Sequence, residues 1–336
     1  MGMLILDRRD MAVRLDGEAA AVYEGGTRKG SVPLKLVTLI VVHGSGIALD
    51  AGVLGQVAEN GGIGVLLSGR YGRRVAYVIG PGHNDISARL GQARAVTDGA
   101  QIDAWAARLV LAKLRHQQRF VARAIGLRAD QRKPLVDTQR RLAAEIVRLR
   151  AYTEASQPNP GAAALRGIEG SAAAAYFKGY ACLFADSLQF NGRNRRPPRD
   201  PVNACLSLAY TLLHALAVKA CQVAGLDPLM GLYHRPSHGR ASMASDLIEP
   251  LRAMADEWVW ALFRERTLRP EHFWHNGAAC LLGKSGRGHF YQAFTPLRKT
   301  AERWLRVQCR TLTQQWRDAG ALLLLPDGGE AGEDEA

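Results

Sequence analysis

The sequence lacks the paired cysteines of a disulfide framework or of a structural zinc site. Its five cysteines are odd in number, and no two of them are spaced as C-x-x-C. They are Cys182, Cys205, Cys221, Cys280 and Cys309, and most of them lie inside apolar helical stretches. Cysteine behaves as a small apolar residue in such surroundings, so we expect buried free thiols in a reducing compartment.

The sequence also lacks a secretory leader and a membrane-length apolar run. Charged residues from Asp7 to Asp10 interrupt any apolar segment near the start. The longest apolar stretches are shorter than the roughly 20 residues that span a bilayer. We therefore expect a soluble, cytoplasmic protein with no membrane partner.

No nucleotide-binding or hydrolase signature is present. The stretch His43-Gly44-Ser45-Gly46 is rich in glycine but fits neither G-x-x-x-x-G-K-[ST] nor G-x-G-x-x-G, so we interpret it as a turn. The chain has no H-E-x-x-H zinc motif, no serine nucleophile elbow and no Cys–His nucleophile pattern. It also shows no internal repeat of fixed period.

Length and charge set the broad class. A chain of 336 residues predicts about two domains, and its 47% apolar content is ordinary for a globular protein. The charge is unusual, because 44 Lys and Arg against 31 Asp and Glu give +13. Five acids and no base follow from Asp327 onward, so the positive excess lies entirely before that residue. Such an excess favours a polyanion partner, although a merely soluble basic protein stays open.

The first 80 residues alternate like short β-strands. Strand-like runs recur at L-I-L-D, M-A-V-R-L-D, A-A-V-Y, S-V-P-L-K-L, L-I-V-V-H and V-A-Y-V-I, separated by Gly and Asp turns. One helical segment interrupts them, with Asp50 as its N-cap and Gly61 as its stop, and I-G-V-L-L follows as a strand. We expect a strand–helix–strand unit beside a mostly antiparallel sheet.

After the break at Gly80-Pro81-Gly82, apolar residues recur with helical period. The sequence predicts a helix capped by Asp103, a helical segment after Pro134, a buried helix from Pro201 to Gly225, and a last helix from Pro296 to about Ala319. His214, within the buried helix, is interpreted as a core histidine.

These patterns predict an α+β, multidomain fold. The predicted parts are a β-rich domain over residues 1–84, an all-α domain over residues 85–320 and an acidic, disordered tail over residues 321–336.

Two basic segments are candidate DNA contacts. The loop from Phe190 to Asn203 is stiffened by prolines and displays Arg193, Arg195, Arg196 and Arg199. Guanidinium groups suit phosphate oxygens, but a solvated linker is the alternative. The second segment is a Gly-rich turn before the last helix, where Lys284, Arg287 and His289 could touch phosphate.

The stretch Gly231 to Arg252 carries the clearest chemistry. His234 lies in a turn, and Asp246 and Glu249 follow at i, i+3 spacing on one face of a helix. Glu169 heads an Ala-rich helical run upstream. One imidazole with two or three carboxylates suits Mg²⁺ or Mn²⁺ better than structural zinc.

Bland alternatives remain for these residues. A turn histidine that bonds the backbone explains His234, and a helix-terminal acid explains Asp246. Pro250 would leave the carbonyl of Asp246 without its i+4 partner, which loosens the backbone beside the acids. In a basic chain, a bound divalent ion and arginines that hold phosphates point to phosphodiester chemistry.

Three ordered motifs carry a family resemblance. L-R-G-I-E-G-S-A-A-A-A-Y-F, R-N-R-R-P-P-R-D-P-V-N-A-C-L-S-L-A-Y-T-L-L and G-L-Y-H-R-P-S-H-G-R-A-S-M-A-S-D-L-I-E-P-L-R resemble successive signatures of the CRISPR-associated adaptation integrase family. The resemblance extends from about Met3 to about Gly320. It implies a β-sandwich-like N-terminal domain that holds a homodimer, followed by an all-helical catalytic domain.

The resemblance also implies a metal site and a reaction. One Mg²⁺ or Mn²⁺ per subunit would be bound by Glu169, His234 and Glu249, with Asp246 as an additional catalytic acid. Many relatives have Asp at the position of Glu249, which is a mild departure. The implied reaction is transesterification, in which a 3′-hydroxyl of a captured DNA duplex (the prespacer) attacks a phosphodiester at the edge of a CRISPR repeat.

The implied assembly is a heterohexamer, in which two homodimers clamp a dimer of a small companion adaptation subunit. Two rival functions stay open. One is a metal-dependent, structure-specific DNA nuclease outside any CRISPR locus. The other is a catalytically silent DNA-binding scaffold.

Overall fold

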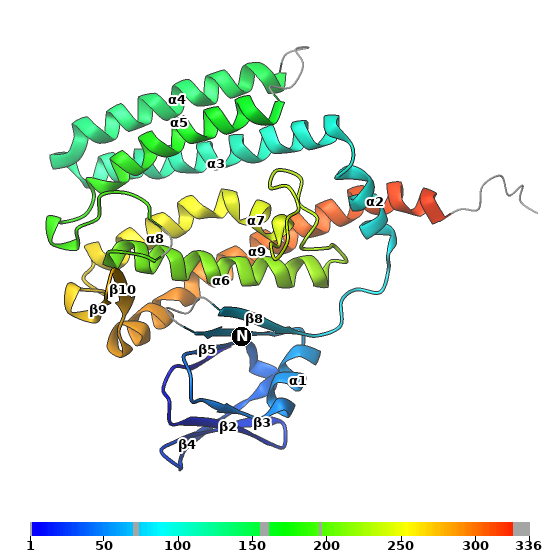
Figure 1. Ribbon diagram of the computed structural model, residues 1–336, viewed down its shortest axis with the longest axis vertical. Coiled ribbons are helices and arrows are strands. Elements are labelled where there is room, and N and C mark those ends of the chain that lie inside the picture. The colour runs from blue at the N-terminus through cyan, green and yellow to red at the C-terminus, as the bar shows by residue number, and fades with distance from the viewer. Residues whose placement is uncertain (1, 70–73, 155–160, 195–196, 325–336) are drawn as a thin grey trace, which may run out of the picture.

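The computed structural model describes residues 2–69, 74–154, 161–194 and 197–324. A β-rich N-terminal part lies against a larger helical part (Figure 1). The strands of the N-terminal part end at Ile79 and the next helix begins at Ser87, so the predicted α+β arrangement is confirmed. The exact division into domains at residues 84 and 85 stays a prediction.

Two four-stranded sheets form the N-terminal part. The first has the order β1-β5-β7-β8, and β1, β5 and β7 are parallel while β8 is antiparallel to β7. The second has the order β4-β3-β2-β6 and is antiparallel except for the β2–β6 pair. The strands are β1 (Gly2–Leu6), β2 (Met11–Asp16), β3 (Ala19–Glu24), β4 (Thr27–Pro33), β5 (Val37–His43), β6 (Ala48–Leu49), β7 (Ile63–Ser68) and β8 (Arg74–Ile79).

The helix α1 (Ala51–Glu59) connects β6 to β7, as the sequence predicts. Asp50 caps it by accepting the N–H of Gly52 at 2.8 Å. Gly61 follows with a φ of +71°, a conformation that suits glycine. Side chains of both sheets and α1 form one small core, which includes Leu6, Val13, Leu34, Ile40, Val53 and Val57. The β-sandwich-like arrangement is therefore present.

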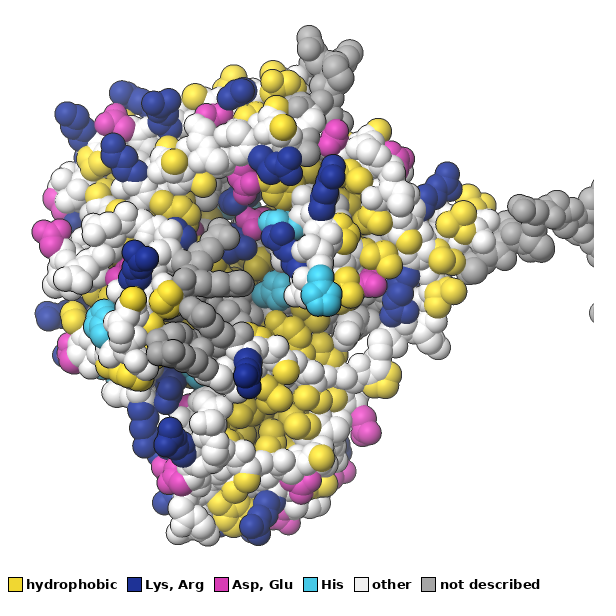
Figure 2. All heavy atoms as spheres, in the orientation of Figure 1, with side chains coloured by type: hydrophobic (Ala, Val, Ile, Leu, Met, Phe, Trp, Pro, Cys, Tyr) yellow, Lys and Arg dark blue, Asp and Glu magenta, His cyan; other side chains and the backbone are white. Residues whose placement is uncertain are grey.

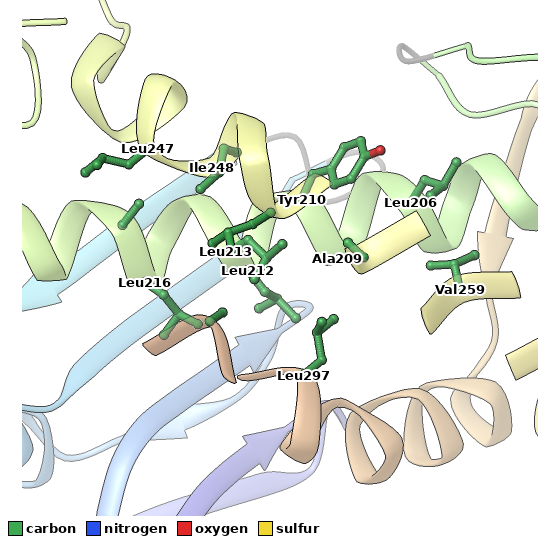
Figure 3. Packing of buried hydrophobic residues seen from close by; sticks show 14 of the residues in the cluster. Leu206, Ala209, Tyr210, Leu212, Leu213, Leu216, Leu247, Ile248, Val259 and Leu297 are labelled. Carbon is green, nitrogen blue, oxygen red and sulfur yellow. The ribbon is translucent and has the colours of Figure 1, made fainter. Parts of the chain in front are cut away.

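The helical part is built around one buried helix, α6 (Pro201–Val223). Figure 3 shows α6 between the α7 segment that carries Leu247 and Ile248 and the α9 segment that carries Leu297. The other elements are α2 (Ser87–Ala95), α3 (Gly99–Leu127), α4 (Arg132–Glu154), α5 (Gly161–Ala181), α7 (Ser242–Ile248), α8 (Arg252–Arg264), β9 (Phe273–Asn276), β10 (Ala279–Leu282) and α9 (Lys284–Ala321).

The start of α3 differs from the prediction. The helix begins at Gly99, and its N-cap is Asp98, whose carboxylate accepts the N–H groups of Ala100 and Gln101. Asp103 therefore lies inside the first turns of the helix. Two acids in one short stretch could each cap, and Asp98 satisfies the exposed N–H groups one turn earlier.

The last helix also starts earlier than predicted. α9 begins at Lys284, and Pro296 lies inside it. Gly286, which was predicted to lie in a turn, is part of this helix. A Cβ on Gly286 would lie 2.6 Å from Leu282 Cδ1 and 2.9 Å from His272 Cβ. Gly286 thus permits close packing against the β9–β10 hairpin. The prediction that this part is wholly helical missed that hairpin.

α6 is long and apolar enough to cross a membrane, with a mean hydropathy of 1.5 over its best window, which corrects the expectation that all apolar runs are too short. However, 56% of that window is buried inside the protein, as in a core helix. His214 is half-buried and bonds Tyr77 Oη at 3.2 Å and the Ala241 carbonyl at 3.3 Å. Its interpretation as a structural histidine is confirmed.

Two further predictions concern the cysteines and the tail. All five cysteines are free, four of them are buried and Cys182 is half-buried, which confirms the expected thiols. For the predicted tail over residues 321–336, Ala321 ends α9 and residues 322–324 form a 3₁₀ turn. The rest of the tail lies outside the described residues.

Candidate active site

Glu169 projects from the middle of α5 and not from its head. One of its carboxylate oxygens, Oε1, lies 2.5 Å from Lys113 Nζ of α3. The other, Oε2, accepts a hydrogen bond from the Tyr233 hydroxyl. Glu169 thus joins α3, α5 and the turn that carries His234.

Glu249 contacts the same lysine, Lys113. Its Oε2 lies 2.7 Å from Lys113 Nζ, and its Oε1 accepts the Nε–H of Arg252 at 2.8 Å. Burial alone would raise the pKa of this carboxyl, but the charges of Arg252, Lys113 and His234 outweigh burial and lower the pKa to about 2. Glu249 is therefore ionised throughout the physiological range.

The backbone changes at Glu249. α7 ends at Ile248, and a 3₁₀ turn over Glu249–Leu251 follows before α8. Pro250 has no N–H for the Asp246 carbonyl, which instead accepts the N–H of Glu249. The 3₁₀ turn thus gives the Asp246 carbonyl a partner, and the loosened backbone expected beside the acids is not observed.

Lys113 was not predicted. It lies on the buried face of α3 with Val110, Leu114 and Gln117, and it is only 9% exposed. Burial lowers the pKa of its ammonium, but Glu249 and Glu169 more than compensate and leave the pKa raised. A lysine on an apolar helix stripe is the sequence signal that could have identified it, because such a charge needs a partner.

Asp246 holds the turn before α7. Its buried carboxylate accepts the backbone N–H groups of Leu232, Tyr233 and His234 at 2.9, 3.0 and 2.9 Å. It also contacts His234 Nδ1 at 2.6 Å. Burial raises the pKa of Asp246, and these hydrogen bonds oppose that rise. All of these contacts are with the turn, so the structure uses Asp246 to position His234.

The contact with Asp246 fixes one face of the imidazole. A carboxylate at Nδ1 favours a proton on that nitrogen and leaves Nε2 as the acceptor. No hydrogen bond to Nε2 is found within the described residues. His234 lies close enough to Glu249 to help lower its pKa, and its neighbour Tyr233 contacts Glu169. The turn histidine therefore bonds an acid and not simply the backbone.

This arrangement can be tested for its fit to a divalent cation. Among the described residues, no three His, Cys, Asp or Glu side chains stand at metal-binding distances. Instead, an ammonium contacts both carboxylates, and Glu249 Oε2 is a buried oxygen without a well-formed hydrogen bond. Two carboxylates around one cation, beside an imidazole with its Nδ1 fixed, suit Mg²⁺ or Mn²⁺ once the ammonium withdraws.

On the outer surface, histidine, acidic and basic side chains gather around a hollow in the middle of one face (Figure 2). In the same orientation, Figure 1 draws the layer of α3, α4 and α5 above α6. The side chains of Glu169 and His234 are each 21% exposed, so solvent reaches both.

The arginines of the predicted basic loop differ in their surroundings. Arg193 donates to Asn203 Oδ1 at 2.8 Å and Ser207 Oγ at 3.1 Å, and it stacks on Tyr210 at 5.4 Å. This guanidinium anchors the loop. Arg199 is exposed, and Arg195 and Arg196 lie outside the described residues. DNA contact by these arginines stays a prediction.

The second predicted basic segment lies in the first turns of α9. Lys284 and His289 are exposed. Arg287 donates to Asp7 Oδ2 at 3.1 Å and to the Asp7 carbonyl at 3.0 Å, so it ties α9 to the N-terminal part. A role of these residues in DNA binding is likewise untested.

A buried acid behind the site was also missed. Asp256 of α8 accepts the hydroxyls of Tyr176, at 2.8 Å, and of Tyr210. Arg252, which binds Glu249, stacks on the ring of Tyr210 at 4.5 Å. The Asp256 network therefore supports Arg252 from behind.

Most of this chain matches a known protein family. A profile of the family described as CRISPR associated protein Cas1 matches residues 4–296. The chain belongs to the Cas1 family. The CRISPR-associated endonuclease Cas1 1 of Thermodesulfovibrio yellowstonii is 33% identical over 94% of each chain. The CRISPR-associated endonuclease Cas1 2 of Rhodospirillum rubrum is 35% identical over 87% of this chain and 84% of the relative.

Solved structures agree on the Cas1 fold. A casposase bound to an integration product superposes with a TM-score of 0.76 at 18% identity, over 94% of this chain and 91% of the casposase. A Cas1 protein from Thermotoga maritima gives 0.72 at 19% identity, over 98% and 100% of the two chains. A Cas6-RT-Cas1–Cas2 complex gives 0.74 at 20% identity, over 96% of this chain and 35% of the matched chain. The family resemblance drawn from the three motifs is confirmed.

Proposed function

We propose that this Cas1 protein is a metal-dependent DNA integrase and endonuclease of CRISPR adaptation. It would join the 3′-hydroxyl ends of a captured DNA duplex to phosphodiesters at a CRISPR repeat, and so insert new spacers. Relatives named as Cas1 endonucleases support the class of reaction. The likeness to a casposase bound to an integration product supports strand transfer.

The observation that carries the proposal is the convergence of Glu169 and Glu249 on one cation position beside His234. These residues come from α5, the 3₁₀ turn after α7 and the loop before α7. Two carboxylates held this close to one another are stabilised by a cation that lies between them. Glu169, Glu249 and Nε2 of His234 would hold one Mg²⁺ or Mn²⁺ per subunit.

When bound, the ion would polarise the scissile phosphate and offset charge in the transition state. Asp246 keeps His234 oriented through the hydrogen bond at Nδ1. Arg252 binds Oε1 of Glu249 while Lys113 contacts Oε2, so Arg252 would keep Glu249 in place when the cation changes. The Tyr233 hydroxyl fixes one oxygen of Glu169, which leaves Oε1 to face the cation position.

Lys113 has a distinct part in this proposal. Its ammonium neutralises both carboxylates while no divalent ion is present, and it must leave that position when one binds. A displaced lysine on a four-carbon stem could then approach a nearby phosphate.

The proposed partners follow from the family and from charge. Double-stranded DNA, as prespacer and CRISPR repeat, suits the net charge of +13. One matching structure is described as a Cas1–DNA complex and another as a complex with Cas2. We infer a homodimer that joins a small companion adaptation subunit in a heterohexamer, in the cytoplasm.

A second candidate is a metal-dependent, structure-specific DNA nuclease or integrase outside any CRISPR locus. The likeness to a casposase favours keeping it. The genes beside this one discriminate the two, because a CRISPR array and a companion-subunit gene belong to adaptation alone. A silent DNA-binding scaffold is the third possibility, and a catalytic assay excludes or establishes it.

The test is strand transfer of a short labelled duplex into a plasmid that carries a CRISPR repeat. We expect product with Mn²⁺, none with chelator, and none with Glu169→Gln, His234→Ala or Glu249→Gln. Glu257→Gln is the matched control, because this half-buried acid pairs only with Arg123 in the described residues. Duplex binding without any product from the parent protein would establish the scaffold reading instead. Equal product from the parent and all variants would show that these three residues do not carry the reaction.

A further inference from the structure

A second basic site lies on the other side of α6 from the candidate active site. A groove of about 870 Å³ opens between α9, the C-terminal half of α6 and the turn after α1. Its walls include Leu216, Lys219 and Val223 of α6 and Asn60 near α1. α7 packs on the opposite side of α6 (Figure 3), so this α9 groove is separate from the candidate active site.

One face of α9 lines the groove with cations. Lys299, Arg303, Arg306 and Arg310 follow each other at i, i+4, i+7 and i+11, which keeps all four on one helix face. All four are exposed, and none forms an ion pair within the described residues. At 1.5 Å per residue the stripe is about 16 Å long.

The floor of the groove is also positive. Lys219 is half-buried there, and burial lowers the pKa of its ammonium. The one acid in the lining is Glu302, whose carboxylate lies 3.9 Å from the buried Arg298. Arg317 completes the lining at the far end, where Asp85 pairs with it at 3.1 Å. An anion in the groove would therefore meet several cations and little opposing charge.

We propose that the α9 groove binds the phosphodiester backbone of DNA, at a site separate from the one where strands are joined. The inference rests on the proposed action of this Cas1 protein on DNA. A straight row of four guanidinium and ammonium groups over about 16 Å matches about five phosphate steps of one strand, at 3.4 Å per step along the duplex axis. Such a row, without base-reading loops, holds DNA independently of its sequence.

Two other occupants compete with DNA for the groove. The net charge of +13 does not favour a second copy of this chain in a basic groove, and the homodimer inferred above is held through the β-rich part instead. The acidic run from Asp327 onward has the opposite charge and follows the same helix in sequence, so it is the alternative that the truncation below tests.

The test compares two triple variants of the full-length protein in fluorescence anisotropy with a 30-base-pair duplex and a metal chelator. The groove variant is Arg303→Gln, Arg306→Gln and Arg310→Gln. The control variant, Arg132→Gln, Lys133→Gln and Arg140→Gln, removes the same charge from exposed positions of α4. Each is measured across a series of salt concentrations.

We expect the groove variant to lose at least about tenfold in affinity near 0.1 M salt, and its salt slope to fall by about 2 to 3, because each lost phosphate contact removes about 0.9 from the slope. The control variant should stay within about twofold of the parent. Equal losses in both variants, or no loss in the groove variant, would overturn the proposal.

The same substitutions are then made in a chain that ends at Leu324. If the groove holds DNA, the tenfold loss persists without the acidic segment. If the loss disappears, the groove binds that segment and the proposal is wrong. Because binding is read without metal, this result is independent of strand transfer: absence of strand transfer by the parent protein would refute the proposed function alone.

Discussion

The ammonium nitrogen of Lys113 lies 2.5 Å from an oxygen of Glu169, so α3 and α5 are joined by an ion pair at the centre of the candidate site. The same nitrogen lies 2.7 Å from Glu249. Lysine thus occupies the place between two carboxylates that a divalent ion would take. A divalent ion that binds at this position must displace Lys113, and that displacement costs free energy.

Replacing Lys113 with methionine should separate stability from metal affinity. Without metal, Glu169 and Glu249 lose their shared cation, and we expect a loss of about 3 kcal/mol, typical of breaking a buried pair. Mn²⁺ should then bind more tightly than to the parent, because no ammonium competes. Thermal unfolding with and without Mn²⁺ measures both effects. An equal or smaller stabilisation of Lys113→Met by Mn²⁺ would show that the lysine does not occupy the metal position.

The Asp246→Asn variant should fold less stably and bind metal more weakly. The amide has one carbonyl oxygen to replace two carboxylate oxygens that serve three backbone N–H groups and His234. We expect a loss of about 2 to 4 kcal/mol and a 10- to 100-fold weaker Mn²⁺ affinity. Urea unfolding and Mn²⁺ titration are the measurements. Unchanged Mn²⁺ affinity would mean that Asp246 does not orient His234.

Asp256 should make stability depend on pH. Burial raises the pKa of Asp256 from 3.8 to about 6, against the opposing effect of the Tyr210 and Tyr176 hydroxyls. The folded protein therefore binds this proton more tightly than the unfolded chain. The resulting stability is complete below about pH 4 and is lost as the pH rises through about 6, a change of about 3 kcal/mol.

Asp256→Asn carries no such proton. The free energy of unfolding of this variant should improve relative to the parent by about 3 kcal/mol between about pH 4 and pH 7. Urea unfolding at several pH values checks the sign. Parallel pH curves for the two proteins would contradict the raised pKa.

Two glycines should be irreplaceable where α2 crosses α9. A Cβ on Gly91 would lie 1.9 Å from the Trp316 carbonyl oxygen, and one on Gly320 would lie 1.7 Å from the Ser87 carbonyl oxygen. Alanine at either position forces the helices apart, and we expect a loss of at least about 2 kcal/mol. Gly126→Ala is the control, since nothing lies within 4 Å of its Cβ, and it should stabilise α3 by about 0.5 to 1 kcal/mol. Thermal unfolding that ranks the three variants otherwise would exclude this crossing.

Local signals in the sequence were sufficient for part of the fold. The strands separated by glycine turns, and the helix that follows Asp50, are determined by residues close together in the sequence. The start of α9 was not, because Gly286 is required by Leu282 and His272, which are contacts beyond its own turn. Spacing alone likewise could not separate Asp98 from Asp103 as the cap of α3.

The candidate site was likewise predictable only in part. His234, Asp246 and Glu249 lie within one short stretch, and their residue types suggested a cation site. Glu169 was added to them as an upstream carboxylate, and its role as a ligand came from the family motifs. The partnership of Glu169 with Lys113 and Tyr233 depends on how α3, α5 and the turn approach one another, which no pattern within a single segment contains.

The first sheet of the N-terminal part is buried on both faces. Leu39, Val41 and Val65 point into the helical core, while Leu6 and Ile40 point into the small core with α1. A fragment that begins at residue 85 would leave the helical core open to water along this sheet-facing surface. The two parts therefore do not unfold independently, and they should melt in a single cooperative transition. A force applied to the β-rich part would be transmitted directly to the helices that hold the acids.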